Sequence, residues 1–375
     1  MVKISRRRFI EIGFISTVGF SFFGCSPFYE FVQEEEQRMP EKPSVEGTGN
    51  DVILSTDLYY PRYCTRRQAI SGDFDDFFDL LCMFGLHCKN EITLRMVVLD
   101  RTEEQEHRPG KVLVERLNQI TGAGVPSGVS HTALLEGLYN SPGPATVVMV
   151  GSLTDLWQAY LQDPELCRSK IKEVWVFAGD AQENPERGHR DGRDYHPQGL
   201  EYNVAMDPYA FAGIMASELP IVWIPCYDGG LVGSHSDGKN MVHGSYHLSQ
   251  YGELLSEASQ QVGELFVEAK SSELSDGSLY DWNTLQKNKR SLFGVGIFRA
   301  IHRPQLDYPF HFIDTGITVN DNGTITMGGS KQVKLFERSD MPGFYERMTQ
   351  LSAETIGFFG AVQSNPIESP VNRLP

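Results

Sequence analysis

The sequence predicts an α/β protein built on an open, mostly parallel sheet with helices on both faces and an appended C-terminal β-hairpin. Two observations lead to this prediction. Short apolar runs alternate with segments of helical periodicity along most of the chain, a pattern typical of parallel sheets covered by helices. With 375 residues, of which 40% are hydrophobic and 11% aromatic, the chain can also bury a large core in one domain.

Each predicted element follows from a local pattern. Strands are expected at the short apolar runs 51–56, 92–99, 146–150, 174–177 and 221–224. Helices are expected where apolar residues recur at helical spacing, at 77–87, 111–120, 153–161, 208–217 and 246–269. The hairpin is predicted from 312–319 and 324–327, because these runs flank the turn sequence Asn320 to Gly323.

The N-terminal region has the character of an export signal. Ser5 to Ile10 include three consecutive arginines and resemble a twin-arginine signal, followed by an apolar stretch too short to span a bilayer comfortably. Phe22 to Ser26 resemble a lipoprotein cleavage box in which Cys25 is lipidated; the alternative is an uncleaved membrane anchor. The predicted organisation is a signal peptide at 1–24, a flexible tether at 25–50, one α/β domain at 51–360 and a tail at 361–375. We therefore expect an exported lipoprotein of the periplasm or cell envelope.

The charge of the chain limits its partners. The net charge is −16, whereas binding to nucleic-acid polymers or anionic membranes needs a basic surface. A small neutral substrate or a cation fits better, with membrane contact through the lipid anchor only. The sequence leaves the oligomeric state open, with a homo-oligomer among the options.

Two acidic clusters mark the candidate site. Asp57 follows the first apolar run, and Asp73, Asp75 and Asp76 open the next helical segment. Carboxylates at strand-to-helix transitions meet at the carboxyl edge of a parallel sheet, where α/β proteins bind ligands. Such carboxylates suit a hard cation such as Ca²⁺ or the hydroxyls of a sugar. The alternative is an acidic helix cap with a solvated first turn.

Other motifs are weaker. Asp73 to Asp75 also match the Asp-x-Asp of haloacid-dehalogenase-like phosphatases, but no apolar strand precedes them. Gly233 to Gly238 contain serine and histidine without the nucleophile elbow of a serine hydrolase. Among the histidines, His196 and His243 are the best placed to protonate a leaving group, and an ordinary surface role is the alternative for each.

Three separated stretches together resemble the calcium-dependent inosine-uridine preferring nucleoside hydrolases. They match that family's strand with Thr-Asp, Gly and paired Asp, its Gly-Pro-Leu-Thr-Asn segment with Asp-Pro-Glu-Leu, and its Glu-Phe-Asn with Asp-Pro-x-Ala. The matching stretches are Val52 to Asp57 with Gly72, Asp75 and Asp76; Val147 to Leu156 with Asp163 to Leu166; and Glu201 to Pro208 with Leu219 to Trp223. Their order and spacing agree from Val52 to Asp228.

The resemblance implies an exported hydrolase that cleaves the N-glycosidic bond of a nucleoside or related riboside with a Ca²⁺-activated water. It also implies a role for each matching residue. Asp57 is implied as a metal ligand and general base, Asp76 and the Val150 carbonyl as further metal ligands, and Asp75, Glu201 and Asn203 as ribose contacts.

The chain departs from the family pattern in three places. A longer segment, Leu58 to Ser71, separates the first Asp from the Gly, and Lys289 to Gly294 lack the acid of the family's late His-Asp pair. The family's Ala-Gly-Asn is replaced by Val98 to Arg101, so Asp100 is a further candidate substrate contact. Because a metal ligand is missing, a second hypothesis stays open: a lipid-anchored sugar- or nucleoside-binding protein of the same fold that has lost turnover.

Overall fold

The structure, a computed structural model, describes residues 50–58, 74–100, 109–181, 200–226, 244–271, 278–339 and 343–358. Every described residue belongs to one compact unit, residues 46–375. The predicted signal peptide, Cys25, residues 25–49 of the tether and the C-terminal tail lie outside the described residues. Those predicted boundaries therefore stay predictions.

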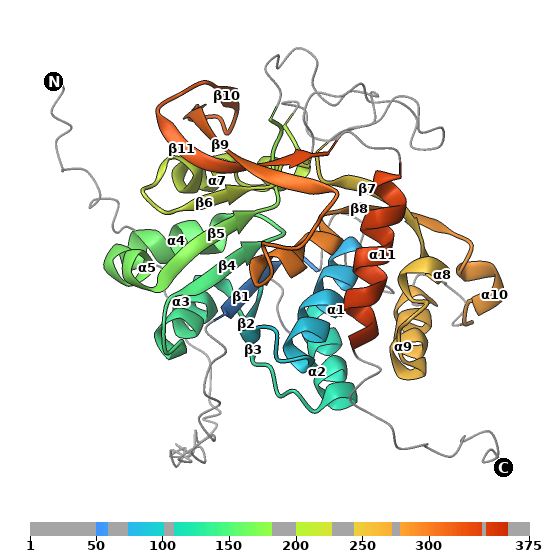
Figure 1. Cartoon of the computed structure of the whole chain (residues 1–375). Helices are drawn as coiled ribbons and strands as arrows, with labels where there is room; N and C mark the ends of the chain where they lie inside the picture. The colour runs from blue at the N-terminus through green and yellow to red at the C-terminus, as the bar shows by residue number, and fades with distance from the viewer. Residues whose placement is uncertain are drawn as a thin grey trace, which may run out of the picture. The chain divides into compact units, whose positions relative to one another are not determined.

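In the described part of the chain, a nine-stranded sheet has the order β10-β9-β11-β6-β5-β4-β1-β2-β3 (Figure 1). Its strands are β1 (Asp51–Thr56), β2 (Thr93–Leu99), β3 (Ser127–Val129), β4 (Ala145–Met149), β5 (Ile171–Val176), β6 (Ile221–Trp223), β9 (Phe310–Val319), β10 (Ile325–Met327) and β11 (Lys331–Arg338). In this order, every pair of adjacent strands from β11 to β3 is parallel. Strand β9 pairs antiparallel with both β11 and β10. The predicted mostly parallel sheet and appended hairpin are confirmed.

Helices cover both faces of the sheet. One face carries α3 (Ser130–Asn140), α4 (Thr154–Gln162), α5 (Pro164–Lys170), α6 (Tyr202–Met206) and α7 (Pro208–Ala216). The core on the other face includes α1 (Phe74–Cys88), α2 (Pro109–Thr121), α8 (Tyr251–Leu254), α9 (Gln260–Ser271), α10 (Trp282–Leu285), the 3₁₀ helix η4 (Val295–Ile301) and α11 (Phe344–Ile356). Across the ranges given above, no helix is both long and apolar enough to cross a bilayer.

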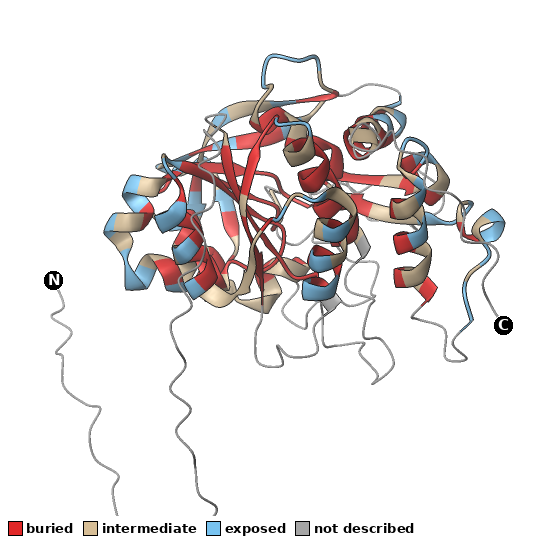
Figure 2. Ribbon diagram, turned by 90° about the horizontal axis from the view of Figure 1, so that it is seen from below, coloured by how far each residue is buried: buried red, intermediate tan, exposed pale blue. Residues whose placement is uncertain are grey.

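The strands are buried from both sides. Val52 and Leu54 of β1 belong to one hydrophobic core and Ile53 to the other, because successive side chains of a strand point to opposite faces. Figure 2 shows the buried residues concentrated in the strands and on the inward sides of the helices. Strands covered on both faces read as continuous apolar runs, which explains why the sequence revealed β1 and β4 so clearly.

Two helices begin at Asp-Pro pairs for a local reason. Asp163 Oδ1 accepts a hydrogen bond from Leu166 N at 2.9 Å, and Asp207 Oδ1 accepts one from Ala210 N at 3.0 Å. Proline suits the first turn of a helix because it has no backbone N–H, and an N–H at that position would have no partner within the helix. The cap and the proline together fix where α5 and α7 start.

The long helix predicted at 246–269 is wrong. The segment forms strand β7 (Tyr246–Gln250), then α8 and α9, and β7 pairs antiparallel with β8 (Lys289–Phe293) in a separate two-stranded sheet. Helix α8 begins only after β7: the backbone N–H of Gln250 donates a hydrogen bond to Glu253 Oε2 at 3.5 Å, as in a capping box. The strand partner of β7 lies about forty residues away in the sequence, so local periodicity could not reveal it.

Candidate active site

The predicted site residues lie at the point of the sheet where the chain stops adding strands on one side of β1 and starts adding them on the other. From β1 the chain builds β2 and β3 on one side, then returns to build β4, β5 and β6 on the other. In open parallel sheets, ligands bind outside the carboxyl ends of the strands at this switch point. Asp57 follows β1, Asp100 follows β2 and Val150 follows β4, so all three lie at that edge.

Asp57 is held tightly between the ends of β1 and β4. Its side chain is buried, and it packs against Gly151, the second residue after β4. A Cβ atom on Gly151 would lie 2.9 Å from both Asp57 Cβ and Asp57 N, and 3.0 Å from Asp57 Oδ1. Since real Cβ atoms essentially never approach that closely, Gly151 is required for Asp57 to sit where it does.

The paired carboxylates of α1 have different neighbours. The Thr56 hydroxyl at the end of β1 donates a short hydrogen bond to Asp76 Oδ2, and Asp76 is buried. Asp75 Oδ1 instead lies 2.5 Å from Arg290 Nη2, in an ion pair with strand β8. Consecutive helical residues point about 100° apart, which lets one carboxylate face β1 while the other faces Arg290.

Asn203 joins the ends of β4 and β5. Its Nδ2 donates to the carbonyl oxygens of Val150 and Phe177, each at 3.0 Å. Because both partners are carbonyls, the amide nitrogen must be the atom that faces them. Each carbonyl oxygen has two lone pairs, so Val150 O keeps capacity for a second contact.

Glu201 positions Asn203 through its backbone. Glu201 Oε1 accepts from Asn203 N at 3.0 Å, while Oε2 accepts from Gly179 N at 2.8 Å and Val204 N at 3.2 Å. Burial raises the pKa of Glu201, and these three N–H donors act in the opposite direction. The sequence predicted a ribose contact for Glu201; the structure places its oxygens on backbone amides, as the N-cap of α6.

Asp100 anchors the turn after β4. Its Oδ2 accepts from both the backbone N and the hydroxyl of Ser152, at 2.8 and 2.5 Å. Asp100 N donates to Thr56 O at 2.9 Å, so the carboxylate stays beside the end of β1. The predicted substrate contact by Asp100 remains a prediction.

Cys226 is buried beside the end of β5, with its Sγ 3.9 Å from Phe177 O. Burial, then the nearby carboxylates of Glu201 and Asp75, raise the pKa of the Cys226 thiol well above its usual value. The thiol therefore stays protonated and is not a nucleophile.

The oxygen donors suit a hard cation but form a partial set. Asp57 and Asp76 are neighbours through Thr56, and the Val150 carbonyl precedes the glycine against which Asp57 packs. Hard cations bind such oxygens and complete their shell with water or substrate. Among the residues that the structure describes, no three His, Cys, Asp or Glu side chains are grouped to hold a metal. Where the resemblance implies a late acid, β8 carries Arg290 instead.

Several predicted features fall outside the described residues. They are His196, His243, Gly72, Asp73 and most of the segment from Leu58 to Ser71. From β1, β5 and β6 the chain continues toward residues 59–73, 182–199 and 227–243, which are likewise outside.

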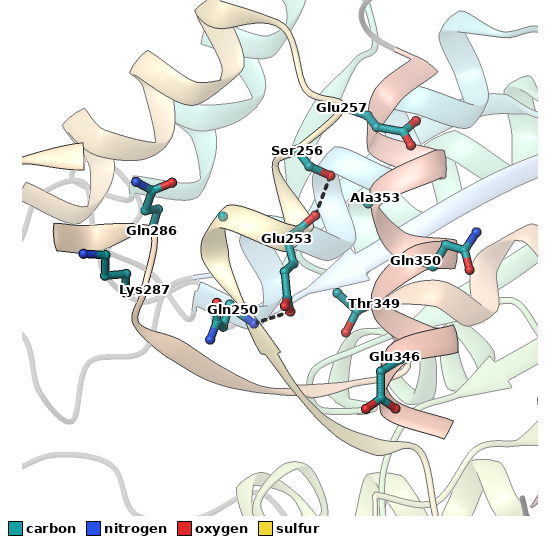
Figure 3. Close-up of a pocket in the computed structure, with 11 residues that line it drawn as sticks. Gln250, Glu253, Ser256, Glu257, Gln286, Lys287, Glu346, Thr349, Gln350 and Ala353 are labelled. Atoms are coloured by element: carbon teal, nitrogen blue, oxygen red, sulfur yellow. Dashed lines mark hydrogen bonds between the residues drawn. The ribbon is translucent and has the colours of Figure 1, made fainter. Parts of the chain in front are cut away.

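Figure 3 shows a separate pocket lined mainly by polar and charged side chains. It has a volume of about 640 Å³ and is lined from α8, α11 and the end of α10, with Glu253, Glu257, Glu346 and Lys287 among its side chains. None of the predicted site residues lines it, and no aromatic side chain does. A concave surface alone does not make a functional site, so the candidate site remains the sheet edge.

Comparison with known proteins supports the same fold. No family model matches the chain. It is 31% identical over 99 residues to the non-specific ribonucleoside hydrolase RihC of Shigella flexneri serotype 5b, and 32% identical over 90 residues to RihC of Salmonella schwarzengrund. The matches cover 26% and 24% of this chain and span only 28% and 26% of the relatives' length.

Two solved structures resemble the chain over most of its length. An inosine-guanosine nucleoside hydrolase aligns with a TM-score of 0.52 at 11% identity, covering 82% of this chain and 98% of that one. The type III effector protein XopQ, complexed with adenosine diphosphate ribose, aligns with a TM-score of 0.50 at 13% identity, covering 83% and 94%. The fold is that of the nucleoside hydrolases. The resemblance predicted from the sequence is thereby confirmed for the fold, and the sequence similarity to ribonucleoside hydrolases covers part of the chain.

Proposed function

We propose that the protein hydrolyses the N-glycosidic bond of a nucleoside or related riboside at the carboxyl edge of β1, β4 and β5. The observation that carries the proposal is the assembly of Asp57, Asp76 and the Asn203–Val150 pair around the switch point. Buried carboxylates at that point would stabilise the positive charge that develops on the sugar during cleavage. The partial match to ribonucleoside hydrolases supports the same reaction class.

Each residue has a proposed part in the reaction. Asp57 accepts a proton from the attacking water, whose oxygen bonds to the anomeric carbon as the bond to the base nitrogen breaks. The base leaves with the bonding electron pair and takes up a proton from solvent. Asp75 binds ribose hydroxyls, and Asn203 holds the ends of β4 and β5 in register beneath the sugar. If Ca²⁺ binds, Asp57, Asp76 and Val150 O would hold it, and it would lower the pKa of a bound water by several units.

The runner-up is a binding protein that keeps the sugar site without turnover. The sequence feature behind this second function is the stretch Lys289 to Gly294, which carries no acid where the resembled family has its late His-Asp pair. A panel of purine and pyrimidine nucleosides, assayed for reducing sugar with Ca²⁺ and with a chelator, separates the two. Sugar release that the chelator suppresses supports the calcium-dependent hydrolase, and release unaffected by it supports a hydrolase without the metal. Saturable binding without any release supports the binding protein.

Gly151 offers a test of the geometry around Asp57. We expect Gly151→Ala to lower the rate of sugar release by about tenfold to a hundredfold, because a displaced catalytic group loses alignment with its substrate. Initial rates with a nucleoside that the panel identifies check this. Gly143→Ala is the control, since a Cβ there meets nothing within 4 Å. Equal rates in both variants would contradict the placement of Asp57.

We also propose export and lipid anchoring through Cys25, on the sequence motifs alone. Labelled palmitate should enter the protein expressed in a bacterial host, and the label should be lost in Cys25→Ser. Recovery of both forms in the soluble cytoplasmic fraction would contradict the proposal.

A further inference from the structure

Arg290 brings a positive charge into the acidic site from a distant part of the chain. Its Nη2 lies 2.5 Å from Asp75 Oδ1, although 215 residues separate the two. The Arg290 side chain is 35% exposed and that of Asp75 16% exposed. A partly buried ion pair is screened less by solvent than a surface pair, so this contact carries more weight than most.

Arg290 lies in a β-strand and not in a loop. It lies on β8 opposite Ser249 of β7, and Ser249 Oγ lies 2.5 Å from Thr349 Oγ1 of α11. Tyr246 and Phe293, at the other end of the same pairing, pack ring against ring at 5.5 Å. A charged group on an anchored strand is held in place more firmly than one on a loop.

Asp75, the partner of Arg290, lies in the first turn of α1 beside the predicted metal ligand Asp76. Asp75 precedes the buried Asp76, and its carboxylate acts electrostatically on Cys226, the neighbour of Glu201. A carboxylate fixed by a guanidinium keeps one orientation, which a sugar-binding group needs. The same positive charge opposes a dication bound at the adjacent carboxylates.

We propose that Arg290 is a positioning residue with two effects: it orients Asp75 for the ribose hydroxyls and weakens divalent-cation binding at Asp57 and Asp76. The proposal rests on the proposed function for its first effect only. The two effects predict changes of opposite sign when the charge is removed. A residue with a merely structural role would not produce that combination.

Calorimetric titration of the full protein with inosine, and separately with Ca²⁺, tests both effects. We expect Arg290→Gln to weaken inosine binding by about tenfold, as for loss of a hydrogen bond to a charged group. We expect the same variant to strengthen Ca²⁺ binding by about tenfold or more, because a neighbouring charge is gone. Arg290→Lys should restore Ca²⁺ affinity to the original value and recover part of the inosine affinity.

The matched control is Arg299→Gln. Arg299 Nη1 pairs with Glu354 Oε2 at 2.8 Å, with side chains 15% and 34% exposed, between η4 and α11. This variant removes a comparable ion pair away from the site, so it should leave both affinities unchanged. Arg290→Asp adds an acid in place of the cation and should bind Ca²⁺ most strongly of all.

The outcomes separate the two proposals. If the unmodified protein binds no inosine, uridine or ribose, the proposed function fails while the Ca²⁺ titrations still decide the charge effect. Unchanged Ca²⁺ affinity in both Arg290→Gln and Arg290→Asp, or no Ca²⁺ binding by any form, overturns the charge effect. Unchanged inosine affinity in Arg290→Gln overturns the orienting effect. If Arg290→Gln does not fold, Arg290→Lys is tested instead. An inosine affinity of Arg290→Lys equal to that of the original protein would then overturn the proposal that the guanidinium orients Asp75.

Discussion

Replacing Asp57 by Asn is expected to lower kcat/KM for riboside hydrolysis by about 10² to 10⁴-fold, the usual contribution of a general base. This corresponds to about 3–5 kcal/mol of lost transition-state stabilisation. An amide has nearly the shape of a carboxylate, so the tight packing against Gly151 is kept. It cannot take up a proton from water, and it binds a dication more weakly. Initial rates of sugar release, with Ca²⁺ affinity measured in parallel, check the prediction.

The control for Asp57 is Asp321→Asn. Asp321 is exposed in the turn between β9 and β10, so the same loss of charge occurs away from the site. It should leave the rate unchanged. A rate in Asp57→Asn within threefold of the original would remove Asp57 from the chemistry and, with it, the proposed mechanism.

The parts of the fold that sequence predicted are those whose cause is local. The buried strands β1 and β4 are recognisable from their continuous apolar residues, and the start of α7 is recognisable from its Asp-Pro pair, whose cap acts within three residues. The sheet-edge placement of Asp57 and Val150 then followed from the alternation of strands and helices. These features required no knowledge of distant contacts.

The parts that sequence missed depend on partners far away in the chain. Strand β7 was predicted as helix because its pairing with β8 is not visible in its own periodicity. The sequence around Arg290 showed only that an acid is missing there. The pairing of Arg290 with Asp75 was not visible, because it spans 215 residues. The hydrogen bonds of Glu201 to the backbone were also not visible in the sequence, because one of its three donors is Gly179, beyond the end of β5. The predicted ribose contact of Glu201 stays a prediction.

Because Glu201 accepts these hydrogen bonds, we expect Glu201→Ala to lower the stability of the protein and to disrupt the candidate site. Truncation leaves the N–H groups of Gly179, Asn203 and Val204 without their acceptor, and the first and third of these residues are buried. At about 1–3 kcal/mol for each buried amide, we expect the free energy of unfolding to fall by about 3–5 kcal/mol in urea titration.

The same truncation should release Asn203 from the ends of β4 and β5. Because Asn203 Nδ2 bridges the carbonyls of Val150 and Phe177, its displacement separates the oxygen proposed as a metal ligand from the sugar site. We therefore expect riboside binding to be lost even at temperatures where Glu201→Ala remains folded. Asp281→Ala is the matched control: Asp281 caps α10 through Thr284 N at 3.1 Å, but at an exposed position. Its unfolding free energy should change much less, and its binding not at all. Equal stability losses in the two variants would mean that the buried amides find other acceptors, and that Glu201 does not hold the site together.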